Sequence, residues 1–255
     1  GHLIRIKEEV DPYLEMAAIH LRVHEAQGPA LLFERVKGSS YRAASNIFGT
    51  IERSKFIFRK RFQLIQQLIQ FRNTPKKILQ QPFSAINTGV SALSSIPKKN
   101  SYRKAILHDE IKITDLPLIQ HWADDGGAFI TLPQVYTEDI SKPGVQHSNL
   151  GMYRIQLTGN NYILNEEAGL HYQIHRGIGV HQTKANKAGL PLKVSVFVGG
   201  PPAHTLAEVM PLPEGMSELL FAGLLGGRRF NYFYTDGFCI IADPDLVFKV
   251  EVFPK

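Results

Sequence analysis

Three potential metal ligands, Asn149, His171 and Glu218, lie in separate segments of the chain, and Arg154 follows the first of them by five residues. An amide oxygen, an imidazole and a carboxylate suit a hard or borderline divalent ion that keeps positions open for an anion such as phosphate. A guanidinium offers a planar fork that can bind a carboxylate through two hydrogen bonds. Together these residues predict an enzyme site in which a metal-and-phosphate centre lies beside a carboxylate clamp.

Each of these residues also has an ordinary structural interpretation. Asn149 could cap a turn before a strand, and His171 could be a half-buried strand histidine bonded to a carbonyl. Glu218 falls in the first turn of a predicted helix, where the helix dipole favours a carboxylate. Arg154 could pair with a surface acid. The occurrence of all four together favours the site interpretation.

Several other reactive side chains are better explained by structure. His175 and His181 lie near glycines in a run that resembles a loop, so we expect structural roles. His20 and His24 are four residues apart on a predicted helix but have no third ligand nearby in sequence, so we expect them to face solvent. Cys239, the only cysteine, lies in an apolar strand-like run without an adjoining basic residue, which predicts a core position rather than a nucleophile.

The composition is that of a globular chain. Its 255 residues, 44% of them hydrophobic, allow one large domain or two modest ones with a buried core. No apolar run approaches the ~20 residues needed to cross a bilayer and no leader is evident, so we expect a cytoplasmic location. Both ends of the sequence read as the middle of a fold, and we expect a piece of a longer protein.

The net charge of +6 is concentrated in residues 51–80, where eight basic residues and one acid give +7 and leave −1 for the remainder. Apolar residues recur at helical spacing over residues 55–71, which predicts an amphipathic helix with a basic end. A solvated basic end is the simpler interpretation, and peripheral contact with a membrane surface is the alternative. We expect no nucleic-acid partner, because interleaved aromatics and a recognisable nucleic-acid module are missing.

The hydrophobic patterns predict an α+β fold. A helix is predicted to begin at Asp11-Pro12 and to end before Gly28, followed by a strand over residues 30–36. Residues 73–104 lack periodicity and predict a long connecting segment, so we divide the chain into domains at 1–111 and 112–255. The second domain is predicted to hold two helices, 202–210 and 214–225, among strands whose spacing suits a barrel or sandwich. These strands are predicted at 129–135, 151–157, 170–174, 192–198, 230–234, 238–241 and 246–252.

Four segments resemble the signature segments of the UbiD decarboxylases, which use prenylated FMN, in the same order and with matching spacing. They are Asn149-Leu-Gly-Met-Tyr-Arg154, Gly169-Leu-His-Tyr-Gln-Ile-His-Arg176, Pro201-Pro-Ala-His-Thr-Leu-Ala207 and Met210-Pro-Leu-Pro-Glu-Gly-Met-Ser-Glu-Leu-Leu-Phe-Ala-Gly223. Residues 11–16 and 28–34 resemble the family's N-terminal segments, whereas residues 50–105 have no recognised counterpart. The resemblance implies an N-terminal α/β domain and a split β-barrel that binds flavin. In the family a C-terminal α/β domain follows and supports a homo-oligomer.

The resemblance also implies a role for each matching residue. Asn149, His171 and Glu218 match ligands of a divalent ion, Mn2+ or Mg2+, that bridges to the flavin phosphate. Arg154 matches the arginine that grips the substrate carboxylate, and K+ accompanies the divalent ion. Further residues implied to line the flavin or to border the K+ site are Thr131, Leu150, Met152, Gln156, Met210 and Pro211.

The implied activity is non-oxidative, reversible decarboxylation of an aromatic or α,β-unsaturated carboxylic acid, with quinone biosynthesis as one setting. Loss of CO2 from such an acid leaves a carbanion that no side chain can stabilise, so an organic cofactor is required. A flavin prenyltransferase would supply it. The family continues after the last strand with a segment that carries two relay acids, so we expect this chain to keep the clamp and metal ligands but to lack the proton donor. A non-catalytic flavin-binding barrel and a scaffold module are the alternatives.

Overall fold

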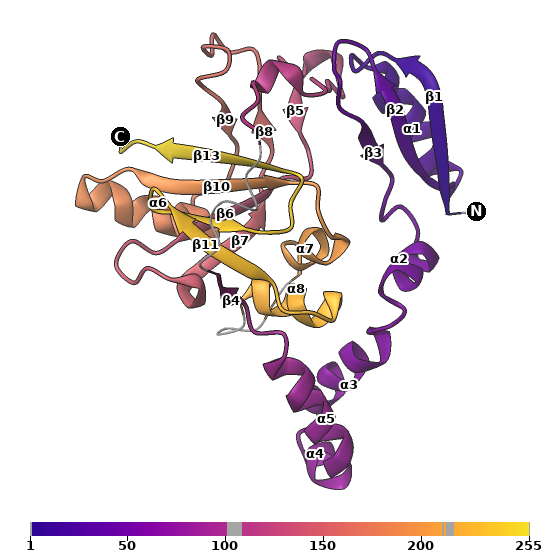
Figure 1. Ribbon diagram of the computed structural model, residues 1–255, viewed down its shortest axis with the longest axis vertical. Coiled ribbons are helices and arrows are strands. Elements are labelled where there is room, and N and C mark those ends of the chain that lie inside the picture. The colour runs from indigo at the N-terminus through magenta and orange to yellow at the C-terminus, as the bar shows by residue number, and fades with distance from the viewer. Residues whose placement is uncertain (1, 101–108, 211, 213–216, 255) are drawn as a thin grey trace. The chain divides into compact units, whose positions relative to one another are not determined.

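The computed structural model describes residues 2–100, 109–210, 212 and 217–254 (Figure 1). These residues form two compact units, each assembled from separate stretches of the chain. The first unit comprises residues 1–57, 109–131 and 154–171, and the second comprises residues 58–108, 132–153 and 172–255. The predicted division into domains at residue 111 describes the chain in a different way and stays a prediction.

The first unit contains a three-stranded sheet formed by β1 (Leu3–Val10), β2 (Ala30–Val36) and β3 (Ala43–Ser45). β1 pairs with β2 in parallel, β3 joins β2 antiparallel, and the helix α1 (Glu15–Glu25) connects the two parallel strands. Apolar residues of β1, β2 and α1 form a shared core, which explains why the strand predicted at 30–36 is confirmed at its full length. The buried members of this core are Val10, Met16, Leu31, Phe33 and Val36.

The predicted start of α1 is wrong by several residues. The side chain of Asp11 accepts a hydrogen bond from the amide of Tyr13 at 2.9 Å, so Asp11 and Pro12 form a turn before the helix. Leu14 then takes a left-handed backbone conformation with φ 62°, and the helix begins at Glu15. The sequence alone therefore does not distinguish an aspartate that stabilises a turn from one that caps a helix.

A second, smaller sheet in the first unit carries residues of the predicted site. It consists of β5 (Phe129–Ile130), β8 (Ile155–Gln156) and β9 (Gly169–Leu170), all antiparallel, with β8 in the centre. Two short 3-10 helices precede it, η1 (Ile113–Asp115) and η2 (Ala123–Asp125).

The second unit contains a four-stranded antiparallel sheet in the order β13 (Leu246–Val252), β10 (Leu192–Val198), β6 (Gln134–Glu138) and β7 (Ser148–Met152). The short 3-10 helix η3 (Val145–His147) leads into β7. The helix α6 (Gly177–Ala188) packs against β6, β7 and β10. A second sheet joins β12 (Phe238–Ile241), β11 (Asn231–Thr235) and β4 (Lys98–Lys99). Two further helices, α7 (Pro202–Ala207) and α8 (Glu218–Gly226), pack on each other.

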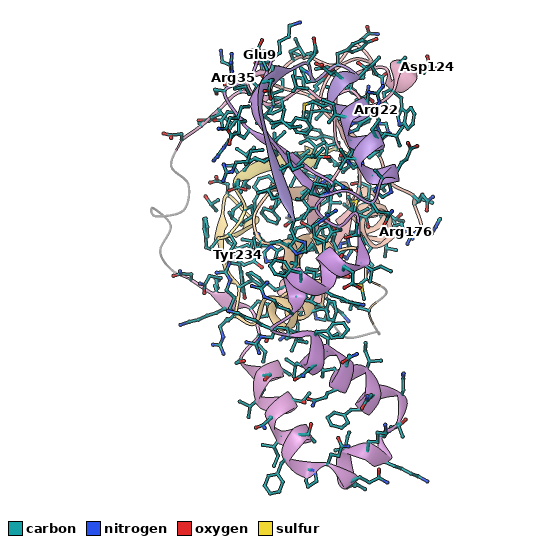
Figure 2. The ribbon with its side chains drawn as sticks, turned by 90° about the vertical axis from the view of Figure 1, so that its right-hand side faces the viewer. Glu9, Arg22, Arg35, Asp124, Arg176 and Tyr234 are labelled. Atoms are coloured by element: carbon teal, nitrogen blue, oxygen red, sulfur yellow. The ribbon has the colours of Figure 1, made fainter. Side chains whose placement is uncertain are left out.

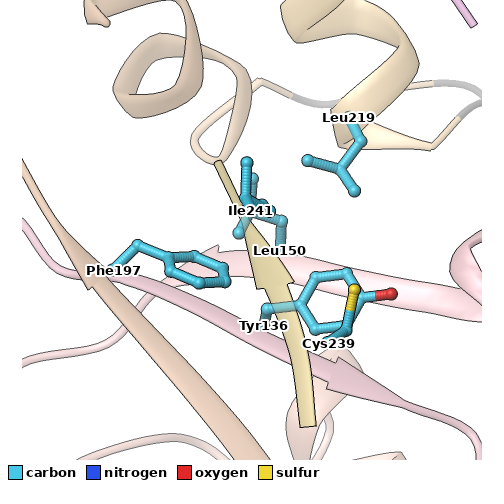
Figure 3. Packing of buried hydrophobic residues seen from close by; sticks show 6 residues of the cluster. All are labelled: Tyr136, Leu150, Phe197, Leu219, Cys239 and Ile241. Atoms are coloured by element: carbon cyan, nitrogen blue, oxygen red, sulfur yellow. The ribbon is translucent and has the colours of Figure 1, made fainter. Parts of the chain in front are cut away.

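The core of the second unit encloses the only cysteine. Figure 3 shows Cys239 packed among aromatic and aliphatic side chains, and it is 3% exposed. Burial raises the pKa of its thiol to about 12, which suppresses the reactive thiolate. The predicted core position of Cys239 is confirmed. The buried residues of this cluster are Tyr136, Leu150, Phe197, Leu219, Cys239 and Ile241.

The structure corrects the prediction for residues 51–100. In place of one helix over 55–71 there are two, α2 (Ile51–Phe58) and α3 (Phe62–Asn73), separated by a turn in which the amide of Arg61 bonds to the carbonyl of Phe58. The predicted connecting segment contains α4 (Lys76–Gln80) and α5 (Pro82–Leu93). Pro82 lies in the first turn of α5, where its missing N–H costs nothing, so this proline starts a helix and does not break one.

Several predicted strands are shorter than expected. The run 129–135 divides into β5 and β6 around Pro133, which cannot donate to a strand ladder. The run 151–157 divides into β7 and β8, and the strand predicted at 170–174 ends at Leu170. The strands predicted at 192–198, 238–241 and 246–252 are confirmed, and the one at 230–234 is displaced by one residue.

The helix α6 was not predicted, because Gly177 and Gly179 suggested a loop. A Cβ atom on Gly179 would lie 2.1 Å from the carbonyl oxygen of Ile174, so this glycine permits close packing within a helix. The two predicted helices exist as α7, which ends earlier than the predicted residue 210, and α8, which begins later than the predicted residue 214. Part of the second prediction falls on residues outside the described ranges.

The predicted α+β class is confirmed. The described strands form open sheets and no closed barrel. None of the helices in the described ranges is long and apolar enough to span a bilayer.

Candidate functional site

Arg154 lies directly before β8 in the first unit and is held by two neighbours. Its guanidinium carbon lies 3.9 Å from the ring centroid of Phe129, and its Nη2 atom donates to Oδ1 of Asp125 at 3.0 Å. The antiparallel pairing of β5 with β8 brings Phe129 alongside. The Arg154 side chain is 41% exposed, so a carboxylate from solvent can reach it.

Asp125 provides the counter-charge for this arginine. Its side chain is only 9% exposed. Burial alone would raise the pKa of Asp125, but the hydrogen bonds from Arg154 and from the amide of Trp122 outweigh that effect and lower the pKa below its usual value. The adjacent Asp124 is exposed (labelled in Figure 2). Of the two neighbouring aspartates, only Asp125 therefore orients Arg154.

His171 follows β9 in the same unit, and its amide donates to the carbonyl of Arg154 at 3.1 Å. Its ring stands edge-on to Phe129, with 5.4 Å between centroids. The Nε2 atom lies 3.2 Å from Oε1 of Gln156, which also accepts a bond from Asn160. Because an amide oxygen only accepts, Nε2 is the donor, and a neutral ring then keeps its lone pair on Nδ1. Nδ1 is thus the nitrogen available to a metal.

Asn149 and Glu218 belong to the second unit, on β7 and at the start of α8. Ser217 caps α8 by accepting a bond from the amide of Leu220 at 3.2 Å, which fixes Glu218 as the first helical residue. The Glu218 carboxylate accepts a bond from the amide of Leu150 at 3.4 Å. Glu218 is therefore anchored to the residue that follows Asn149.

The environment of Glu218 fits a bound cation. Burial raises the pKa of this carboxyl, and no cationic side chain of the described residues lowers it. A partly buried carboxylate is unfavourable without a positive partner, so a metal ion would stabilise its charged form. The amide nitrogen of Asn149 donates to the Tyr153 hydroxyl at 3.4 Å, which leaves the amide oxygen as a potential ligand. The backbone of Gly177 lies against that oxygen, since a Cβ there would be 2.0 Å away.

The four principal residues are thus divided between the two units, with Arg154 and His171 in the first and Asn149 and Glu218 in the second. Their convergence on one site stays a prediction. In the described part of the chain no group of three histidine, cysteine, aspartate or glutamate side chains could hold a metal. The predicted set contains only two such side chains, because its first member is an asparagine.

The remaining predicted residues differ in their surroundings. Leu150 is 1% exposed and its side chain belongs to the core, so any flavin contact would come from its backbone. Met152 and Thr131 are half-buried at strand ends, and Met210 is exposed after α7. Gln156 is buried against His171 as described above. The prediction for Pro211 lies outside the described residues.

The other histidines are resolved by their contacts. His181 is buried on α6 and its Nδ1 lies 2.9 Å from the hydroxyl of Thr137, so its structural role is confirmed. His24 is exposed as predicted. His20 is half-buried and contacts Ser45, so the prediction that it faces solvent is wrong. Burial and then the neighbouring His24 lower the pKa of His20.

Two buried titratable groups, His204 on α7 and Glu208 directly after it, were not predicted. His204 is 0% exposed and Glu208 is 8% exposed, and none of their side-chain polar atoms has a hydrogen-bond partner. Burial lowers the pKa of His204 to about 3 and raises the pKa of Glu208 to about 9. Both groups are therefore neutral in the folded protein at neutral pH. Their spacing of four residues was visible in sequence, but nothing in the sequence indicated their burial.

A cavity of about 360 Å3 in the second unit is lined by residues other than the predicted ones, among them Glu138, Lys193 and Phe238. Glu138 already accepts hydrogen bonds from the hydroxyls of Tyr136 and Tyr234, each at 2.6 Å (Tyr234 is labelled in Figure 2). The amide of Gly144 donates to its second oxygen at 2.7 Å. Because this carboxylate is satisfied by the protein itself, the cavity is a weaker candidate for a site than the clamp.

The family of the chain follows from comparison with known proteins. Residues 95–255 match the 3-octaprenyl-4-hydroxybenzoate carboxy-lyase Rift-related domain of the UbiD family, and residues 1–71 match the N-terminal domain of the same enzyme. A protein of Chlamydia pneumoniae that is named as part of a 4-hydroxybenzoate decarboxylase is 40% identical over 238 residues. A protein of Chlamydia caviae is 42% identical over 234 residues.

Solved structures support the same fold. The vanillic acid decarboxylase of Sedimentibacter hydroxybenzoicus in its closed form matches 100% of this chain and 52% of its own, with a TM-score of 0.80 and 23% identity. An evolved dimeric form of the UbiD-class enzyme HmfF from Pelotomaculum thermopropionicum, in complex with prFMN, has a TM-score of 0.74 and 23% identity over 100% of this chain and 54% of its own.

The matched segments include both the clamp and the predicted metal ligands. The two Chlamydia relatives are matched over 92% and 90% of this chain but over only 39% of their own lengths. The chain thus spans about two fifths of the length of these relatives. On the strength of the two domain matches, which together include most of its residues, the chain belongs to the UbiD family.

Proposed function

We propose that this chain forms part of a carboxy-lyase that removes CO2 from an aromatic or α,β-unsaturated carboxylic acid, with prenylated FMN as its cofactor. The observation that carries the proposal is the clamp: a half-exposed arginine held between a buried aspartate and an aromatic face. Membership of the UbiD family and the decarboxylase names of relatives support it.

Arg154 would bind the substrate carboxylate and fix its orientation. Its Nη2 atom is engaged by Asp125 and its flat face by Phe129, so the guanidinium has little freedom to rotate. A guanidinium held in this way needs no reordering when a carboxylate arrives, and a fixed orientation of the reacting group lowers the barrier. The same contact would hold the leaving carboxylate near the cofactor.

The chain's own residues also fit the cofactor. Asn149, Glu218 and Nδ1 of His171 would hold a divalent ion, Mn2+ or Mg2+, against the flavin phosphate. When bound, the prenylated flavin supplies an electron sink for the carbanion that loss of CO2 would otherwise leave. The partly buried carboxyl of Glu218, whose pKa is raised by desolvation, supports this assignment, because a cation is the partner that it lacks among the described residues.

Further details are proposed from the family resemblance. They are a K+ ion near Met210, delivery of the cofactor by a flavin prenyltransferase, a homo-oligomer, a cytoplasmic location and a setting in quinone biosynthesis. The relatives' names suggest substrates to test first: 4-hydroxybenzoate and vanillate.

Reconstitution tests this function. The chain and the longer Chlamydia pneumoniae relative would each be loaded with prenylated FMN and Mn2+, and flavin absorbance and CO2 release would be measured. We expect bound flavin in both proteins and CO2 release in the relative. A chain that stays colourless under conditions that load the relative would refute the proposed flavin site. Bound flavin without CO2 release from this chain would support a flavin-binding part that lacks the proton donor.

Arg154→Ala separates clamping from cofactor binding. In whichever protein is active, the equivalent substitution should abolish CO2 release while flavin stays bound, because the guanidinium contacts the substrate and not the phosphate. Arg22→Ala, at an exposed position on α1 that is labelled in Figure 2, is the matched control and should change neither quantity. Retention of full activity by the Arg154 variant would contradict the assignment of the clamp.

A further inference from the structure

The helix α5 presents its large apolar side chains outward. Phe83, Ile86, Val90 and Leu93 are 82%, 62%, 59% and 65% exposed, respectively. At 3.6 residues per turn these four positions fall within an arc of ~80° on one side of the helix. A helix of a globular protein normally buries such a stripe against its core. Here the stripe is left open.

The inner face of α5 is small and polar instead. Thr88 is 4% exposed and its hydroxyl donates to Oε1 of Gln67 on α3 at 3.4 Å. At the end of the helix Ser95 is 3% exposed, and a Cβ on Gly223 of α8 would lie 2.4 Å from the Ser95 carbonyl oxygen. Close approach through small residues thus attaches α5 to α3 and α8. The apolar stripe is not needed to hold the helix in place.

A further exposed apolar side chain lies on α4. Leu79 is 85% exposed and precedes Pro82 by less than one helical turn. We define the apolar stripe as Leu79, Phe83, Ile86, Val90 and Leu93. Exposed apolar surface of this kind marks an interaction site.

Basic residues lie at both ends of the stripe. Within the second unit, residues 58–100 contain eight lysines and arginines and no aspartate or glutamate. Lys76 and Lys77 lie on α4 at one end of the stripe. At the other end Arg229 is exposed and donates from Nη2 to the carbonyl of Leu93 at 3.4 Å. The surface therefore combines exposed apolar side chains with cations at both ends.

We propose that the apolar stripe and the flanking cations form a docking surface for an anionic lipid bilayer. An apolar helical face bordered by lysine and arginine is the pattern by which helices lie in a membrane interface. Anionic headgroups attract each nearby cation. A second copy of the chain fits less well, because a symmetric contact would bring two acid-free, strongly basic segments together. The proposal is independent of the proposed decarboxylation.

Vesicle flotation of the purified 255-residue chain tests the surface. We expect the chain to float with vesicles of phosphatidylcholine and phosphatidylserine, and to float much less with phosphatidylcholine alone or at high salt, where charges are screened. The stripe variant Phe83→Ser/Ile86→Ser should bind at least about tenfold more weakly, because two apolar side chains no longer enter the interface. Ile174→Ser, at a position 75% exposed outside the stripe, is the matched control and should bind normally.

A charge variant provides an independent check. Lys76→Glu/Lys77→Glu should also weaken binding to anionic vesicles by about tenfold or more, whereas Lys187→Glu at an exposed position on α6 should not. Circular dichroism would verify that each variant is folded. Equal binding by the stripe variant would reduce the interaction to general attraction between charges and overturn the proposal. Failure to float with anionic vesicles, together with self-association that the stripe variant abolishes, would overturn it in favour of a second copy.

Discussion

Substitution of Glu208 by glutamine is expected to stabilise the protein, and to do so more as pH rises. Glu208 directly follows α7, and both oxygens of its carboxyl are buried without a hydrogen-bond partner. Burial raises the pKa of this group from 4.5 to about 9. Glutamine has nearly the same shape as the protonated acid and never ionises, so it should occupy the site without the cost of taking up a proton.

The magnitude follows from the two pKa values. At pH 7 the unfolded chain has lost the Glu208 proton and the folded protein keeps it, so folding takes up a proton. The unfolded-state pKa of 4.5 lies below pH 7, and each pH unit of this difference costs about 1.4 kcal/mol. Proton uptake at pH 7 therefore costs about 3 kcal/mol of stability. The contribution of the neutral acid to stability is complete below pH 4.5 and is lost as pH rises toward about 9. Glu208→Gln should therefore match the native protein near pH 4.5 and exceed it by about 3 kcal/mol at pH 7.

Urea unfolding at a series of pH values measures this difference. Circular dichroism would report the whole chain, and labelling of Cys239 in a brief pulse at fixed pH would report the second unit, because this only cysteine is buried there. Histidines with lowered pKa values, such as His204, stabilise the fold less as pH falls below 6.5, which is the opposite pH dependence to that of Glu208. Their effect is the same in the variant and the native protein, so it cancels in the difference between the two unfolding free energies. Glu166→Gln, at an exposed site, is the control. A difference independent of pH would show that Glu208 is ionised in the folded state and would refute the reasoning.

Three further substitutions test the candidate site. Asp125→Asn removes the anion that orients Arg154, so the KM for a carboxylate substrate should rise in the active protein. Asp124→Asn is the control and should leave KM unchanged. An unchanged KM in both variants would contradict the orienting role of Asp125. Glu218→Gln should weaken Mn2+ binding by about tenfold or more, as measured by electron paramagnetic resonance. In the native protein Mn2+ binding should tighten as pH rises, because burial raises the pKa of Glu218 and the metal competes with its proton. Gly177→Ala places a methyl group 2.0 Å from Oδ1 of Asn149 and should lower the unfolding free energy by about 1–3 kcal/mol. Gly89→Ala in α5 meets no atom within 4 Å and should raise it by up to about 1 kcal/mol, so thermal unfolding that moves both in one direction would contradict the packing argument.

The elements that could be predicted best are strands whose pattern is set by burial. β10 has a nearly continuous apolar run between two neighbouring strands, and its predicted bounds 192–198 agree with the structure. β12 is buried at all four positions and is equally well predicted. In such segments the local hydrophobic pattern and the tertiary environment agree, so the sequence alone suffices.

The secondary-structure prediction was wrong where the role of a residue depends on a contact with a residue far away in the sequence. Gly177 and Gly179 resemble loop residues, yet they give α6 the close approach that its neighbours require. The stripe of α5 has helical spacing, but it was overlooked within a segment rich in proline and serine. Its apolar side chains also face outward, and the inner face is small and polar. Apolar residues at helical spacing ordinarily indicate a face that packs on the core, but on α5 they form an exposed surface.

The candidate site shows the same division between what chemistry reveals and what only the fold can show. Arg154 was recognisable because a guanidinium five residues after a potential metal ligand suggests a function. Its partner Asp125 was not, since Asp124 and Asp125 stand side by side before two glycines and are equivalent in sequence. The 3-10 helix η2 directs Asp125 to Arg154 and leaves Asp124 in solvent. A residue that binds a substrate can be recognised in sequence from its side-chain chemistry. A residue that orients such a side chain can be recognised only from its position in the fold. The Asp124 and Asp125 substitutions therefore test the fold as directly as they test the clamp.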